Sequence, residues 1–101
     1  MYRMTIHYFM IKSFRHKGLE AFFRQGSKAG IQAAHASKLA RQLARLDEAA
    51  GPQDMHIPGW GLHPLHGGLE HHWSISVSGN WRLTFTFDGN DAILLDYQDY
   101  H

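Results

Sequence analysis

The segment from Trp81 to Phe87 constrains the fold of this chain more than any other part of the sequence. Large apolar residues alternate strictly with polar ones along it. Successive side chains of a β-strand point to opposite faces, so this alternation predicts a half-buried strand. Trp81, Leu83, Phe85 and Phe87 are expected on the buried face. Arg82, Thr84 and Thr86 are expected on a polar outer face.

Residues 72–78 and 92–97 also read as strands, and turn residues separate both from the central strand. Ser78-Gly79-Asn80 predicts a hairpin turn before Trp81, and Asp88-Gly89-Asn90 predicts a second turn after Phe87. We expect Trp73, Ile75 and Val77 to face inward, with the alternating serines, Ser74, Ser76 and Ser78, facing outward. The last half of the chain therefore predicts a meander of three antiparallel strands.

Two helices are expected before this meander. Residues 18–25 have the pattern of a short helix closed by Gly26, and residues 31–50 that of a long amphipathic helix ended by Gly51-Pro52. Residues 62–66 are expected to be extended, at a sheet edge or in a loop because of Pro64. The predicted fold is α+β, with two N-terminal helices packed on one face of a small, mainly antiparallel sheet that residues 10–14 join.

At 101 residues the chain is expected to form one domain over residues 10–101, preceded by an extension of uncertain origin at residues 1–9. It contains no cysteine, which excludes disulfides, iron–sulfur clusters and thiolate zinc sites. No apolar run reaches the roughly 20 residues of a membrane span, and the start does not resemble a signal peptide. We therefore expect a cytoplasmic protein.

The charges are distributed unevenly along the chain. Residues 1–46 hold nine of the ten Lys and Arg residues and one acid, whereas residues 47–101 hold eight acids and one base. The basic half indicates either a nucleic-acid surface or helices with solvated cations. Lys38, Arg41 and Arg45 on the long predicted helix are the candidate contacts for RNA or the ribosome.

Arg82 is the only Lys or Arg after Arg45. A permanent cation on the outer face of a rigid strand could hold an anion such as a phosphate. The alternative is a solvated strand arginine that pairs with one of the later carboxylates.

Histidines are abundant in the same half of the chain. Six of the nine follow Arg45, namely His56, His63, His66, His71, His72 and His101. A histidine exchanges protons near neutral pH, and Tyr100 could stack on a base or donate a hydrogen bond. Together with a cation, these groups are the parts needed to cleave RNA without a metal: a base, a charge for the phosphorane and an acid.

Several motifs resemble those of the HigB toxins, or plasmid maintenance killer proteins, of the RelE-like superfamily. The resemblance covers residues 10–101 and lies in four places: Leu62-His63-Pro64-Leu65, Trp73-Ser74-Ile75-Ser76-Val77, Asn80-Trp81-Arg82-Leu83-Thr84-Phe85 and Asp99-Tyr100-His101. The start, from Met10 to Leu19, is similar to the usual start of that family.

This resemblance implies the toxin of a type II toxin–antitoxin pair, which cuts messenger RNA in the ribosomal A site without a metal or other cofactor. The implied reaction is attack of a 2′-hydroxyl on the adjacent phosphate. By position, the resemblance assigns the active site to His63, Arg82, Asp99, Tyr100 and His101, and to His66, which stands where close relatives usually have a lysine. The implied partners are the ribosome, messenger RNA and a HigA-type antitoxin with a helix-turn-helix. Operator DNA is expected only through the antitoxin, and no membrane is expected.

Two alternatives of other classes remain open. The first is a histidine-rich metal-binding protein, against which His71 and His72 count because neighbours on a strand face opposite sides. The second is a RelE-like binding module that holds antitoxin and ribosome without cutting RNA; the histidine at position 66 favours it, and the retained Arg82 counts against it.

Overall fold

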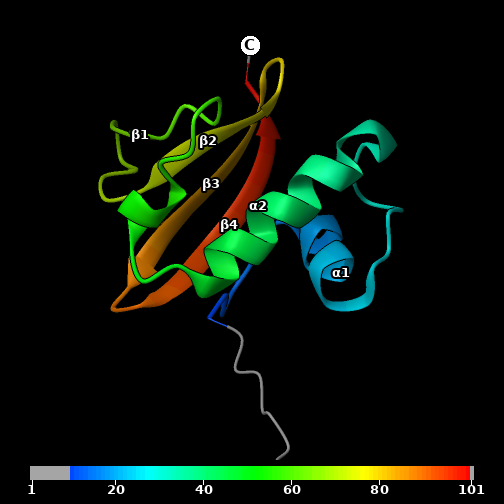
Figure 1. Ribbon diagram of the computed structural model, residues 1–101, viewed down its shortest axis with the longest axis horizontal. Coiled ribbons are helices and arrows are strands. Elements are labelled where there is room, and N and C mark those ends of the chain that lie inside the picture. Colours follow the sequence, from blue (N-terminus) through cyan, green and yellow to red (C-terminus); the bar gives the residue numbers. More distant parts are fainter. Residues whose placement is uncertain (1–9, 101) are drawn as a thin grey trace, which may run out of the picture.

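The computed structural model describes residues 10–100 of the chain (Figure 1). The expected extension at residues 1–9 and the terminal His101 lie outside these residues. The elements are, in order, α1 (Lys17–Gln25), the 3₁₀ turn η1 (Ala33–His35), α2 (Ala36–Glu48), the 3₁₀ turn η2 (Pro52–Met55), β1 (His63–Pro64), β2 (Trp73–Ser78), β3 (Trp81–Asp88) and β4 (Asp91–Asp99).

The four strands form one sheet in the order β1-β2-β3-β4, and each neighbouring pair is antiparallel. This arrangement confirms the predicted meander and the edge position of Pro64. The segment at residues 10–14 lies beside β4 and runs parallel to it. It forms isolated bridges from Ile11 to Ala92 and from Phe14 to Leu95 rather than a regular strand.

Both helices begin and end for local reasons. The Nδ1 atom of His16 accepts a hydrogen bond from the Leu19 N–H at 2.9 Å, and α1 ends at Gly26, whose φ is 77°. The long helix is shorter than the predicted span of residues 31–50. Its start is tied to β4, because the Tyr97 hydroxyl accepts from the Gln32 N–H at 3.3 Å and contacts His35 Nδ1 at 2.6 Å.

The hydrophobic core lies between the helices and one face of the sheet. It contains Leu19 of α1 and the α2 residues Leu39, Leu43 and Leu46, packed with strand residues such as Leu83 and Phe85. Both helices thus cover the same face, as predicted, and Figure 1 shows α2 crossing in front of β4. Within residues 10–100, no helix combines the length and apolar character needed to cross a bilayer.

The polar face of the sheet, which was expected to carry Arg82, Thr84 and Thr86, is largely buried. Ser74, Thr84 and Thr86 are 0%, 6% and 8% exposed. Ser74 on β2 and Thr84 on β3 lie in the middle of the sheet, because each of these strands pairs with a strand on both sides. Thr86 is covered by the segment after β1, since its hydroxyl donates to the His71 carbonyl at 2.7 Å. We call the side of the sheet opposite the helices the outer face. Its open part is confined largely to the end that carries Arg82.

Candidate functional site

Arg82 is half-buried on the outer face of β3, and the hairpin before it holds its side chain. Its Nη1 atom donates to the Gly79 carbonyl at 2.9 Å, and lies 3.3 Å from both the Ser76 hydroxyl and the Trp81 carbonyl. Among residues 10–100 no carboxylate lies within ion-pair distance of Arg82, and its Nε and Nη2 atoms make no hydrogen bond. The guanidinium is therefore fixed on one side and available to an anion on the other.

Tyr100 is held by the same hairpin turn. Its N–H donates to the Asn80 carbonyl at 2.8 Å, directly beyond the end of β4. Gln98 is the cross-strand partner of Arg82. Because side chains two apart on a strand share a face, Tyr100 projects on the same side of the sheet as Arg82. Tyr100 is 37% exposed, so its side chain can contact a bound ligand.

Asp99 takes a different direction from Arg82. It is the cross-strand partner of Trp81, whose ring packs on Tyr97 on the helix side of the sheet. Its side chain therefore leaves β4 toward the helices, while that of Arg82 leaves β3 toward the outer face. The strand itself runs to Asp99, two residues beyond the predicted end at Tyr97, because the pairing with β3 continues to Trp81.

His63 lies on the outer face, on the edge strand β1. It is the cross-strand partner of Ser74, and its imidazole is exposed. Its Nδ1 lies 3.0 Å from the Gly61 carbonyl oxygen. A carbonyl oxygen only accepts, so Nδ1 must carry the proton of the neutral ring. The Nε2 atom then has a free lone pair, which is the state a general base requires.

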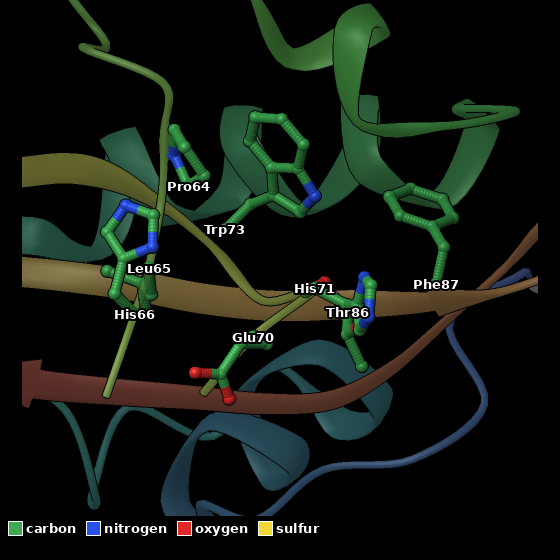
Figure 2. Close-up of a pocket in the computed structure, with 8 residues that line it drawn as sticks. All are labelled: Pro64, Leu65, His66, Glu70, His71, Trp73, Thr86 and Phe87. Atoms are coloured by element: carbon green, nitrogen blue, oxygen red, sulfur yellow. Dashed lines mark hydrogen bonds between the residues drawn. The ribbon is translucent and has the colours of Figure 1, made fainter. Parts of the chain in front are cut away.

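His66 is exposed and follows β1 in the segment that folds over the end of β3. It lines a cavity of about 520 Å³ (Figure 2). His101, the last of the predicted active-site residues, lies outside the described residues.

Lys38, Arg41 and Arg45 occupy one side of α2, at the i, i+3 and i+7 spacing of a helix face. We call these three residues the basic stripe. Lys38 is half-buried, whereas Arg41 and Arg45 are exposed; Arg41 donates to the Ser37 hydroxyl at 3.1 Å and Arg45 to the Asp54 carbonyl at 2.9 Å. Since α2 packs on the helix side of the sheet, the basic stripe and Arg82 are separated by the sheet.

Sequence reasoning missed the cavity beside His66. Its walls come from the segment after β1 and from the adjoining ends of β2 and β3, and its lining residues are Pro64, Leu65, His66, Glu70, His71, Trp73, Thr86 and Phe87. Backbone N–H groups of Glu70 itself and of Gly68 hold the pKa of the Glu70 carboxyl below its ordinary value, and the charges of His66 and His71 act in the same direction. The signal available in the sequence was Gly67-Gly68, which turns the chain back over the strands.

The histidines do not gather as the metal-binding alternative requires. No group of three or more metal-ligating side chains within residues 10–100 is placed to share an ion. The placement of His71 and His72 on a strand was also wrong. His71 lies in a turn with a φ of 70°, and β2 begins at Trp73, after His72.

Comparisons with known proteins identify the family of the chain. Residues 12–101 match the family described as the RelE-like toxin of the type II toxin–antitoxin system HigB. The chain is also 42% identical over 92 residues to the endoribonuclease HigB of Proteus vulgaris, which covers 91% of this chain and 100% of that protein.

Proposed function

The chain belongs to the HigB family of RelE-like toxins, and from this premise we propose that it is the endoribonuclease toxin of a type II toxin–antitoxin pair. The relative from Proteus vulgaris is named an endoribonuclease, which supports the proposed RNA-cleaving activity. The structural observation that carries the proposal is the outer face, where a fixed cation, Arg82, and a histidine with a free Nε2, His63, both lie.

The proposed reaction is the cleavage of messenger RNA by its own 2′-hydroxyl. A histidine takes the 2′-hydroxyl proton, the 2′-oxygen forms a bond to the adjacent phosphorus, and the bond to the 5′-oxygen breaks. A second group returns a proton to that oxygen, which leaves a 2′,3′-cyclic phosphate and a 5′-hydroxyl. Arg82 stabilises the negative charge of the phosphorane through its free nitrogens, so the step needs no metal ion.

The positions of the side chains support the following proposed roles. His63 is the favoured base because of its tautomer. Tyr100 is positioned to stack on a base next to the cleaved bond. His66 and His101 are the candidate partners in proton transfer, and Asp99, whose side chain leaves β4 toward the helices, is proposed to support the chain end rather than to touch the phosphate.

We propose that the substrate is messenger RNA on the ribosome, in the cytoplasm. Primer extension on a transcript incubated with the protein, with and without ribosomes, tests this directly. Cuts that need ribosomes support the proposal, and cuts in free RNA at the same rate contradict the ribosome requirement. Growth arrest without cut transcripts would favour the alternative of a binding module that occupies the ribosome.

Metal independence has its own test. A phosphorothioate at the scissile phosphate weakens Mg²⁺ coordination, and a thiophilic ion such as Cd²⁺ restores the rate of reactions in which a metal contacts that atom. We expect no such rescue. Recovery of the rate by Cd²⁺ would show that Arg82 is not the principal charge at the phosphate.

The expected protein partner is a HigA-type antitoxin with a helix-turn-helix, through which the pair would bind operator DNA. Co-expression of the neighbouring small reading frame should relieve growth arrest, and the two proteins should purify together. A neighbouring product that neither binds nor rescues would contradict this part of the proposal.

A further inference from the structure

An acid stands close to Arg82 in the strand register of the outer face. Gln98 of β4 is the cross-strand partner of Arg82. Asp96, two residues earlier in β4, therefore lies diagonally across from Arg82 on the same face of these two neighbouring strands (Figure 1). Side chains at diagonal positions of paired strands are within reach of a residue as long as arginine. An ion pair would be expected here, yet each of the two side chains bonds to other groups.

Two contacts within β4 hold the Asp96 carboxylate. Its Oδ2 atom accepts from the side-chain amide of Gln98 at 2.7 Å, and its Oδ1 atom accepts from the Tyr97 N–H at 2.9 Å. The Tyr97 N–H faces away from β3, because the Leu95 N–H, two residues earlier, donates to the Ser13 carbonyl on that side of β4. Both carboxylate oxygens are therefore engaged by their own strand.

The side chains of Arg82 and Gln98 leave their pair of strands in opposite directions. Arg82 reaches the Gly79 carbonyl in the hairpin, at the end of the sheet where β4 finishes. Gln98 turns back along β4 to Asp96, toward the middle of the sheet. The bond between Gln98 and Asp96 thus keeps both of these side chains directed away from the guanidinium, whose Nε and Nη2 atoms stay open.

We propose that Gln98 is a positioning residue for Arg82: it holds the Asp96 carboxylate and so prevents this acid from pairing with the guanidinium that is to bind the RNA phosphate. A carboxylate and a phosphate both fit the planar fork of an arginine, so they compete for it. Without the Gln98 amide, Oδ2 of Asp96 loses its donor, and Arg82 is the sole Lys or Arg of this half of the chain that can replace it. The proposal rests on the proposed function, because it assigns Arg82 to the phosphate.

The test variant is Gln98→Met, which removes the amide donor and keeps an unbranched side chain of similar length at an exposed strand position. Gln25→Met, at the exposed last residue of α1, is the matched control. A second variant, Gln98→Met with Asp96→Asn, also removes the charge that would compete for Arg82.

The first measurement is the NMR signal of the Arg82 Nε–H, identified by its loss in Arg82→Lys. In Gln98→Met we expect the signal to shift and its exchange with water to slow, because the carboxylate now pairs with the guanidinium. The signal should return toward its wild-type position in the double variant and should be unchanged in Gln25→Met. An unchanged signal in Gln98→Met, or a change that persists in the double variant, overturns the proposal.

The second measurement is single-turnover cleavage of ribosome-bound message at saturating protein. Gln98→Met should cut about threefold to fivefold more slowly than the wild type, the extent to which a partly exposed ion pair can withdraw Arg82, with ribosome binding unchanged. Asp96→Asn in the same chain should remove this loss, whereas a merely structural role of Gln98 would leave it in place and overturn the proposal. If the wild type cuts no transcript, the proposed function fails on its own, and the Arg82 signal still decides whether Gln98 keeps Asp96 and Arg82 apart.

Discussion

Replacement of Arg82 by alanine separates a catalytic role from a structural one, and the structure allows both effects to be sized. The structural contribution is small. The shortest of its bonds, from Nη1 to the Gly79 carbonyl at 2.9 Å, lies at an exposed position, and the other two are 3.3 Å long. The net loss is therefore about 0.5–1.5 kcal/mol. A domain with a free energy of unfolding of about 5 kcal/mol would then keep about 3.5 kcal/mol or more and remain more than about 99% folded at 25 °C.

The expected catalytic loss is far larger. Removal of one preorganised charge at a developing oxyanion typically lowers the rate by about 10²–10³-fold. Unfolding of less than about one molecule in a hundred cannot produce such a loss. The assay is single-turnover cleavage of ribosome-bound message at saturating protein, with thermal unfolding measured on the same samples. Arg82→Lys keeps the charge without the planar fork, and we expect an intermediate rate.

Arg24→Ala is the matched control. Arg24 is an exposed arginine of α1 that also has a defined partner, Glu20 at 3.0 Å, and it lies outside the proposed site. Its loss costs about 0.3–0.5 kcal/mol and should leave the cleavage rate unchanged. If Arg82→Ala cuts within about tenfold of the wild type, or if its melting temperature falls far more than the about 4–8 °C that 1 kcal/mol represents, the reasoning is wrong.

Four further changes test other parts of the molecule. Reversal of the whole basic stripe to glutamate should weaken ribosome binding and flatten its dependence on salt, and equal binding at physiological salt would exclude this face. His101→Ala should slow single-turnover cleavage by about 10²–10⁴-fold with ribosome binding retained, and an unchanged rate would leave proton transfer to the other histidines. Asp47→Ala removes the buried acceptor of the Met10 and Ile11 N–H groups, at 2.8 and 3.2 Å, and should lower the free energy of unfolding by about 2–3 kcal/mol in urea titrations. Burial raises the pKa of Tyr97, so its neutral hydroxyl stabilises the fold below pH about 10, and this contribution is lost as the pH rises through the folded pKa. Tyr97→Phe should therefore flatten the fall in the free energy of unfolding at alkaline pH. An unchanged fall would show that other groups cause the alkaline loss of stability.

The strands and turns could be predicted because each depends on neighbours in the sequence. Alternation places Leu83 and Phe85 on one face, and Gly79 and Gly89 supply the positive φ of the two turns. One local feature escaped prediction. Leu94 has a φ of 59°, at the point where the β3–β4 register shifts between Thr84 and Thr86. Its N–H is bonded to the Ser13 hydroxyl at 2.9 Å, a contact 81 residues away in the chain that no local pattern reveals.

The same limit explains which parts of the candidate site could be foreseen. Arg82 and Tyr100 lie near the same hairpin because β3 and β4 pair there, and strand periodicity predicts which face each one occupies. Periodicity does not show what covers a face. The burial of Thr86, the cavity and the position of Glu70 all depend on how the segment after β1 folds back over β3.

The two faces of the sheet suggest a physical reason for the proposed need for the ribosome. Arg82 is the sole Lys or Arg after residue 45, so a free RNA strand that reaches the outer face meets one fixed cation there from this half of the chain. One phosphate contact gives little affinity at physiological salt. The basic stripe lies on α2, on the other side of the sheet, and the strand that is being cut cannot easily contact both. A partner that surrounds the protein can reach both sides at once, so that ribosomal RNA on the α2 side supplies the affinity while the outer face needs only to orient the message. If this division holds, charge reversal in the stripe will weaken binding without changing the single-turnover rate at saturation, whereas Arg82→Ala will do the opposite.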